Sequence, residues 1–427
     1  MSIPIPRNTK HASQGRPVLQ DSQPAQLKRA LNLAFLTFYG LGTILGAGIY
    51  VLVGKVAGLA GLYTPVAFLV AAAIAAVTAF SYAELSSRLP KSAGEAVYVQ
   101  EGFGVRSLSL AVGLLLVLAG VVSSATLANG FFGYFRVFFD APEWLVITLL
   151  VAGLGGLATW GIAESAIAAT GATLIEIAGL ILIIAVSADS LATFPARLPE
   201  LLPPFESAVW AGIAAGAFLA FYAFIGFEDM VNVAEEVKDP RRTLPLAIIL
   251  AMVISTTLYL LVATAAVLAV PLTELAATQA PLALMFQRAT GEPPLVISAI
   301  SLFAVVNGAL VQIIMGARVL YGMGEAGWLP RWFSRIHPRR RTPHRATACV
   351  TAAALILALW LPLVTLAKAT SFTILIVFAL IHAALLRIKR RGPAAPGVRT
   401  YPAWIPATGF VLTLAMLAFQ TLSTMAG

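Results

Sequence analysis

Four glycines lie within nine residues of the first long apolar segment, in the stretch FYGLGTILGAGIYVLVG from Phe38 to Gly54. Each glycine weakens an α-helix by about 1 kcal/mol relative to alanine. A second apolar segment is interrupted in the same way in FYAFIGFEDMVNVAEE, residues 221–236, where Gly226 stands beside Glu228 and Asp229. Both segments are therefore expected to unwind near their midpoints.

A helix that unwinds inside a membrane leaves peptide N–H and C=O groups without partners, and this is tolerated only where something polar satisfies them. The N–H groups and the positive dipole end of a half-helix suit a carboxylate, and the freed carbonyl oxygens suit an ammonium group. A zwitterionic amino acid meets both requirements. Packing of small residues between helices is the alternative for the first stretch alone, but the matched second break favours a binding site.

The composition requires that the elements carrying these stretches cross a membrane. Of the 427 residues, 59% are hydrophobic and only 11% are charged, and the mean hydropathy is +0.89. Soluble domains carry about a quarter charged residues, so the chain is expected to be an all-α polytopic membrane protein. The single cysteine, Cys349, excludes an internal disulfide framework and a cysteine metal site. We expect no metal and no cofactor.

Eleven apolar segments have the length of about 20 residues that is needed to cross a bilayer. They lie near residues 33–58, 64–88, 105–138, 142–160, 165–188, 208–234, 243–270, 293–325, 345–361, 363–387 and 402–424. The broken segments are the first and the sixth, a spacing that predicts two five-helix repeats over residues 31–190 and 205–390. An additional transmembrane helix is expected over 400–427, and a disordered cytoplasmic tail over 1–30.

The Lys and Arg residues are concentrated on one side of these segments. With a cytoplasmic N-terminus, 22 of the 28 fall on the inner side, four on the outer side and two within segments. This bias predicts a multi-pass protein of the cell (inner) membrane with its N-terminus in the cytoplasm. The bias also explains the net charge of +9, so the expected partner is the lipid bilayer and not a nucleic acid.

Five stretches, in order along nearly the whole chain, resemble the amino acid–polyamine–organocation (APC) superfamily of transporters. Residues 40–54, GLGTILGAGIYVLVG, resemble its first-helix signature GxGxIIGAGIFVLTG, and residues 221–248 resemble its sixth helix. The other three stretches are residues 82–104, 317–330 and 366–382. The resemblance implies the leucine-transporter-type 5+5 inverted repeat, with helices 1 and 6 broken, and alternating access to a site at the membrane midplane. Glu95 departs from the superfamily, which often has a small residue there.

Carried over residue by residue, the resemblance implies substrate-binding residues in both breaks. In the first break, backbone N–H groups would hold the substrate carboxylate; the residues are Thr43, Ile44, Gly46, Ala47 and Gly48. In the second break, carbonyl oxygens would hold the amine and an aromatic lid would cover the side chain; the residues are Phe221, Tyr222, Ala223, Phe224 and Ile225. Tyr222 stands where a related exchanger has a gating tryptophan. Packing is the alternative role for each aromatic residue.

Three acidic residues at membrane depth are expected to serve in coupling or gating. Glu176 lies well inside the fifth segment, where proton-dependent relatives have a lysine that takes the place of a sodium ion. It would carry a proton or pair with a cation such as Arg318 or bound Na⁺; a structural hydrogen bond is the alternative. Glu228 and Asp229 follow the second break, and acids there resemble proton-linked gates of the superfamily.

The third segment has no acid to bind a cationic side chain, although cationic amino-acid carriers of the superfamily can place one there, at a position that aligns by eye with Leu118. We therefore expect a secondary active transporter of neutral or small apolar amino acids, with H⁺ favoured over Na⁺ as the coupling ion. An exchanger of amines, polyamines or amino acids is the alternative. A membrane-embedded enzyme is remote, because no HExxH, GxSxG or paired intramembrane Asp pattern occurs.

Overall fold

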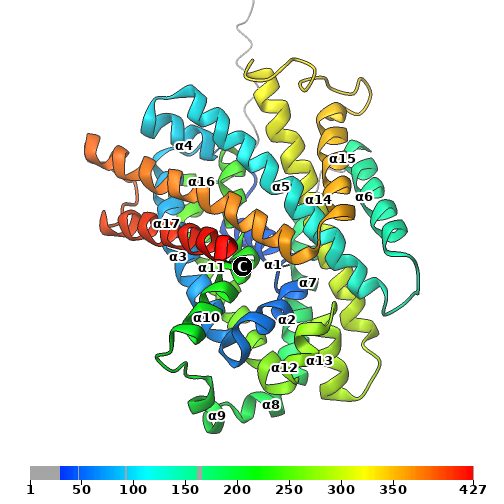
Figure 1. The fold of residues 1–427 in the computed structure, drawn as a ribbon. Coiled ribbons are helices and arrows are strands. Elements are labelled where there is room, and N and C mark those ends of the chain that lie inside the picture. The colour runs from blue at the N-terminus through cyan, green and yellow to red at the C-terminus, as the bar shows by residue number, and fades with distance from the viewer. Residues whose placement is uncertain (1–28, 47, 92–93, 161–165, 427) are drawn as a thin grey trace, which may run out of the picture.

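Apolar runs of membrane-spanning length satisfy their peptide groups internally only as helices, and this chain is correspondingly helical (Figure 1). The structure is a computed structural model that describes residues 29–46, 48–91, 94–160 and 166–426. Within these ranges nine helical stretches are long and apolar enough to cross a membrane, and two shorter apolar helices accompany them. Each of the eleven predicted segments contains helix, so the all-α polytopic class is confirmed. Most of the predicted N-terminal tail lies outside the described residues.

The helices follow the predicted order along the chain. The first five segments form α1 (Leu33–Leu45) with α2 (Gly48–Ala60), α3 (Thr64–Arg88), α5 (Arg106–Phe135), α6 (Glu143–Trp160) and α7 (Ala166–Val186). The next five form α10 (Ser207–Ala220) with η2 (Phe221–Phe224) and η3 (Phe227–Glu236), α11 (Pro240–Ala269), α14 (Leu295–Glu325), α15 (His344–Trp360) and α16 (Leu363–Arg391). The last is α17 (Trp404–Ala426).

Short helices connect the long ones at the two ends of the bundle. They are η1 (Gly61–Tyr63), α4 (Gly94–Phe103), α8 (Ala188–Ala192), α9 (Phe194–Leu201), α12 (Leu272–Ala277) and α13 (Pro281–Thr290). Figure 1 shows α8, α9, α12 and α13 together at the bottom of the molecule and α4 near the top. The end that carries α4 is called the α4 end below.

Both predicted helix breaks are present. In the first segment α1 ends at Leu45 and α2 begins at Gly48. In the sixth segment α10 gives way at Phe221 to the 3₁₀ turns η2 and η3, and Gly226 between them has φ +128°. The second half of this segment is therefore a tighter helix than the α-helix that the sequence pattern predicts, as is often found at hinges or strained sequences.

Unbroken helices pack around the two broken segments. α5 packs along α14 and α16, and α11 packs against α3 and α1. The chain just before α1 is tied to the chain just after η3 by a parallel bridge between Leu31 and Val237. In this bridge Leu31 N–H donates to the Glu236 carbonyl at 3.0 Å, and Lys238 N–H donates to the Leu31 carbonyl at 2.8 Å. The two broken segments are thus joined where α1 begins and η3 ends.

One buried carboxylate, Glu84 on α3, is fully paired. Lys389 Nζ lies 2.6 Å from its carboxylate and Arg88 lies 2.8 Å from it, and the Tyr401 N–H donates to it at 2.9 Å. A buried charge of this kind is stable only when it is paired and hydrogen-bonded. Glu84 therefore has a structural role, fixing the connection to α17 against α3 and α16.

Candidate functional site

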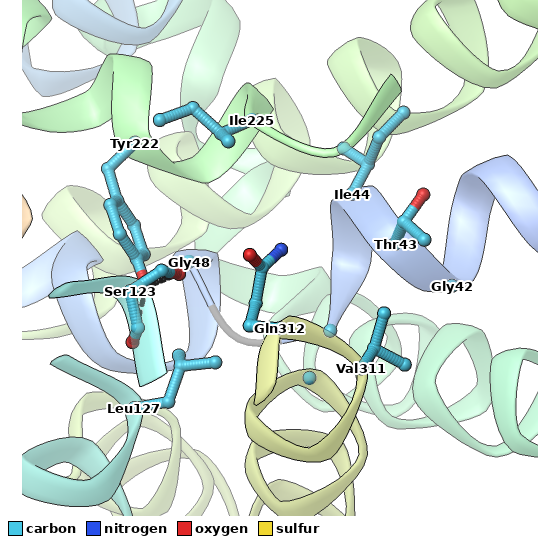
Figure 2. A pocket seen from close by; sticks show the side chains of 12 residues that line it. Gly42, Thr43, Ile44, Gly48, Ser123, Leu127, Tyr222, Ile225, Val311 and Gln312 are labelled. Carbon is cyan, nitrogen blue, oxygen red and sulfur yellow. Dashed lines mark hydrogen bonds between the residues drawn. The ribbon is translucent and has the colours of Figure 1, made fainter. Parts of the chain in front are cut away.

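A cavity lies between the two breaks (Figure 2). It holds about 410 Å³ of space between atoms, part of it open to solvent. Its walls come from both broken segments, α5 and α14; the lining residues are Gly42, Thr43, Ile44, Gly46, Gly48, Ser123, Leu127, Tyr222, Ile225, Gly308, Val311 and Gln312. Figure 2 shows Gln312 between Tyr222 and Ser123 on one side and Ile44 and Thr43 on the other.

Six of the ten predicted substrate-binding residues line this cavity. They are Thr43, Ile44, Gly46, Gly48, Tyr222 and Ile225. Ala47 lies outside the described residues. Phe221, Ala223 and Phe224 are buried and do not line the cavity. Phe221 packs its ring on Phe378, at 6.0 Å between centroids, and Phe224 packs on Tyr259, at 5.1 Å.

Close packing against neighbouring segments, the second break among them, explains glycines of the first break. A Cβ on Gly48 would overlap Ala223 of the second break. A Cβ on Gly46 would lie 2.9 Å from the carbonyl oxygen of Gly42 and 3.5 Å from Gly308 Cα on α14. Because Gly46 and Gly48 line the cavity, the first N–H groups of α2, which an α-helix leaves without internal partners, lie at its wall together with the positive end of the helix dipole.

The second break is held against the first by hydrogen bonds to freed carbonyls. Thr43 Oγ1 lies 2.9 Å from the carbonyl oxygen of Gly226. Tyr259 on α11 places its hydroxyl 2.8 Å from the carbonyl oxygen of Ile44 and 3.0 Å from that of Ala223. A carbonyl oxygen has two lone pairs, so these carbonyls keep the capacity to accept one further hydrogen bond.

The rest of the cavity wall is mostly apolar. Tyr222 is oriented by Ser123 on α5, with 2.8 Å between their hydroxyl oxygens. Four aliphatic side chains face the same space: Ile44, Leu127, Ile225 and Val311 (Figure 2). Among the described lining residues none has a charged side chain. The cavity therefore presents polar backbone and hydroxyl groups beside an apolar compartment, and it offers no counter-charge for a charged side chain.

A second cavity of about 260 Å³ adjoins the first. It is lined by Leu116, Ala119, Gly120, Ser123, Ile225, Glu228, Gln312, Met315, Thr370 and Ile374. Three of these residues, Ser123, Ile225 and Gln312, also line the first cavity. The second cavity uses earlier residues of α5 and later residues of α14, so the row of cavities extends from the breaks toward the α4 end, with Glu228 in its wall.

Glu176, the first of the three predicted coupling acids, lies fully buried on α7. Its carboxylate accepts a hydrogen bond from Asn307 Nδ2 on α14 at 3.0 Å. Its backbone carbonyl accepts one from the Tyr50 hydroxyl on α2 at 2.5 Å. Arg318, which the sequence suggested as a partner, is exposed. Glu176 thus links three helices, including the second half of the first broken segment.

Glu228 and Asp229 differ in their surroundings although they are adjacent. Glu228 Oε2 accepts a hydrogen bond from the Gly226 N–H at 2.8 Å, so this side chain caps the start of η3. Glu228 lines the second cavity. Asp229 is 1% exposed, and neither of its carboxylate oxygens has a hydrogen-bond partner among the described residues.

The walls from α5 and α14 were not among the predicted binding residues. On α14 the lining residues Gly308, Val311 and Gln312 follow the i, i+3, i+4 spacing of one helix face, but the same spacing is typical of ordinary packing. The structure corrects the position inferred for α5. Leu118 is 46% exposed, whereas Ser123 on the same helix lines both cavities. The absence of an acid from α5 remains true for the whole helix.

Several known transporters are similar to this chain. The profile of the amino acid permease family matches residues 31–425. The branched-chain amino acid permease BcaP of Bacillus subtilis is 29% identical over 398 residues, which is 87% of this chain and 83% of that permease. The methylthioribose transporter of the same organism is 27% identical over 87% of this chain and 84% of its own length. The vacuolar cationic amino acid transporter 2 of Arabidopsis thaliana is 32% identical over 85% of this chain, which spans only 60% of that longer protein.

Proposed function

Because this chain belongs to the amino acid permease family and is an amino acid transporter of the membrane, we propose that it carries neutral amino acids with apolar side chains. The observation that carries the proposal is the cavity between the two breaks, with the start of α2 at one wall and aliphatic side chains at the others. A charged side chain in such a space would lack a partner, which costs several kcal/mol.

The substrate is held by the backbone at one end and by side chains at the other. Its carboxylate accepts hydrogen bonds from the first N–H groups of α2, near Gly46 and Gly48, and is stabilised by the dipole of that helix. Its ammonium group meets carbonyl oxygens of the breaks, among them that of the lining residue Ile44. Its side chain lies between Leu127 and Val311, and Tyr222 covers it.

We further propose that the two broken segments begin two five-helix repeats, residues 31–190 and 205–390, with α17 as an additional helix and alternating access around the cavity. The Lys and Arg bias supports a cell inner membrane location with the N-terminus and the α4 end in the cytoplasm. An alkaline phosphatase fused to the C-terminus would then be active, and a fluorescent protein fused there would be dark.

Uptake into proteoliposomes with a panel of labelled compounds tests the substrate class. We expect leucine or valine to accumulate at least about tenfold more than lysine, arginine or putrescine, because a buried unpaired charge costs several kcal/mol. Preferential uptake of a cationic amino acid, a polyamine or methylthioribose would contradict the proposal. Preloading the vesicles with unlabelled substrate separates net uptake from exchange.

A matched pair of α5 variants locates the side-chain compartment. Leu127→Ala removes a wall of the cavity, whereas Leu118→Ala removes a side chain that is 46% exposed on the same helix. We expect Leu127→Ala to shift the uptake ratio of large to small apolar amino acids by about tenfold. The reason is that one methylene group of a substrate changes its binding free energy in a hydrophobic pocket by about 1–3 kcal/mol. Leu118→Ala should leave the ratio unchanged. An equal effect of both variants would place the compartment elsewhere.

We also propose that Glu176, Glu228 and Asp229 couple substrate movement to protons. For Glu176 the test is Glu176→Gln, since the amide oxygen still accepts the hydrogen bond from Asn307 while the charge is removed. Substrate exchange should persist and accumulation driven by a pH gradient should be lost. Unchanged gradient-driven accumulation would show that Glu176 serves only to link α7 with α14.

A further inference from the structure

Three buried carboxyl groups lie on the two elements that pack together where α4 touches η3. They are Glu95 on α4 and Glu228 and Asp229 on η3, with 1%, 2% and 1% of their surfaces exposed. The first turn of α4 touches η3 directly, because a Cβ on Gly94 would overlap the Val231 side chain. The charges of Glu228 and Glu95 both act on Asp229. These three residues are called the acid cluster below.

The hydrogen bonds of the acid cluster leave one member unsatisfied. Glu95 Oε1 lies 3.4 Å from the Tyr82 hydroxyl on α3, and Glu228 accepts the Gly226 N–H. Both oxygens of Asp229 lack a partner among the described residues. A buried carboxylate without a partner is very costly as an ion, in contrast to Glu84 with its lysine and arginine. Asp229 therefore requires something that neutralises it.

Around the acid cluster, the described part of the chain supplies aromatic rings and no unengaged cation. Tyr82 lies against Phe227 and Phe378, each at 5.5 Å between ring centroids, and against Tyr98 at 6.3 Å. Basic groups packed near α4 are engaged at its opposite end, where Arg391 on α16 donates to carbonyls of Glu101 and Gly102 and Arg387 lies over Phe103. Between α4 and α5 the contact is an uncharged hydrogen bond from Ser109 to Gln100. Lys91, which precedes α4, is exposed.

The neutralising partner is therefore small and positive. Among the described residues no ion pair joins a Lys, Arg or His to the acid cluster, and no group of His, Cys, Asp and Glu is arranged to hold a metal ion. A single proton between two neighbouring carboxylates removes one charge and supplies an O–H donor to the other group.

We propose that Glu95 and Asp229 share one proton, and that this proton leaves for the α4 end when η3 moves during transport. The proposal rests on the transport function proposed above, because it gives the coupling proton a place in the structure. Glu228 provides the mechanical connection, since it precedes Asp229 on η3 and lines the cavity that adjoins the substrate cavity. A movement of η3 that separates Asp229 from Glu95 exposes the shared proton and releases it.

The protonation of Glu95 agrees with this arrangement. Burial raises the pKa of the Glu95 carboxyl to about 8, and the charge of Glu228 adds to the rise, while a backbone hydrogen bond and the bond from Tyr82 oppose it. At neutral pH Glu95 is thus mostly protonated. Above pH 8 its ionisation beside Glu228 and Asp229 disfavours the packing of α4 on η3.

The test measures proton movement with substrate in proteoliposomes that contain a trapped pH-sensitive dye. Glu95→Gln keeps the shape of the protonated side chain and cannot release a proton, so substrate-dependent proton entry should fall at least about tenfold while substrate exchange persists. The matched control is Glu101→Gln, an exposed carboxyl on the same helix, which should behave as the unmodified protein. Asp229→Asn is the second variant and should reproduce the loss. Unchanged proton entry with Glu95→Gln, or wild-type uptake that follows a Na⁺ gradient and ignores pH, would overturn the proposal.

A measurement without substrate separates this inference from the function on which it rests. The pKa of Glu95 is raised above its ordinary value, so its contribution to stability is present at low pH and is lost as pH rises through about 8. The Tm of the purified protein should fall between about pH 5 and 8, more steeply than the Tm of Glu95→Gln, and the two pH profiles should run parallel above about pH 8. If no amino acid is transported but this difference is found, only the proposed function fails. If the Tm of the unmodified protein and the Tm of Glu95→Gln depend equally on pH, the acid cluster is not a proton site, even if transport is established.

Discussion

Replacing Gly226 with alanine is expected to reduce amino acid uptake to background. Gly226 has φ +128°, a conformation that costs another residue about 1–3 kcal/mol. The added Cβ would also overlap the carbonyl of Thr43 in the first break and lie 3.0 Å from the Ile44 nitrogen, and overpacking of this kind costs about 1–3 kcal/mol more. Together these two effects destabilise the arrangement of the breaks that forms the cavity by at least about 2 kcal/mol. A loss of that size corresponds to a decrease of about 30-fold in substrate affinity.

The control for this substitution is Gly156→Ala on α6, where an added Cβ meets nothing within 4 Å. This variant should transport as the unmodified protein does, and the exposed helix should gain up to about 1 kcal/mol of stability. Equilibrium binding of labelled substrate to detergent-purified protein, with a monodisperse profile on size exclusion, separates loss of the site from loss of the fold. Retained affinity in Gly226→Ala would show that the site does not depend on the contact between the breaks.

The positions of the two breaks could be predicted because they depend on local chemistry. Glycines clustered in an apolar run, and acids beside a glycine in another, both disfavour a continuous helix at membrane depth. The same local patterns did not indicate that the chain after Gly226 forms the 3₁₀ turn η3. That outcome depends on the contact of Gly226 with Thr43, which lies 183 residues away in the sequence.

The walls from α5 and α14 could not be predicted for a different reason. A transmembrane helix is apolar on its lipid face and on its packed face, so hydrophobic periodicity does not distinguish the two. Leu118 and Leu127 illustrate this, because both are leucines of α5, yet the first is 46% exposed and the second lines the cavity. The sequence marked Glu95 only as an unusual residue type for its position. Its association with Glu228 and Asp229 could not be predicted, because these residues lie more than 130 positions later in the chain.

A disulfide across the Leu31–Val237 bridge is expected to stop transport. Residues 31 and 237 face each other in a parallel bridge, and such pairs have the Cα separation that a disulfide requires. If α1 and η3 separate to open the cavity toward the α4 end, the bridge must break in every cycle. The double variant Leu31→Cys/Val237→Cys, in a Cys349→Ser background, should lose nearly all uptake under oxidant and regain it with a reductant.

The two single-cysteine variants are the controls, since neither can form the cross-link within one chain and both should be insensitive to oxidant. Substrate binding to the oxidised double variant should persist, because the lock is remote from the cavity and restrains only the change of access. Full turnover of the oxidised protein would mean that α1 and η3 stay together throughout the cycle. Substrate would then leave along the second cavity between α5, α14 and α16, and Glu228, which lines that path, would become the residue whose movement controls release.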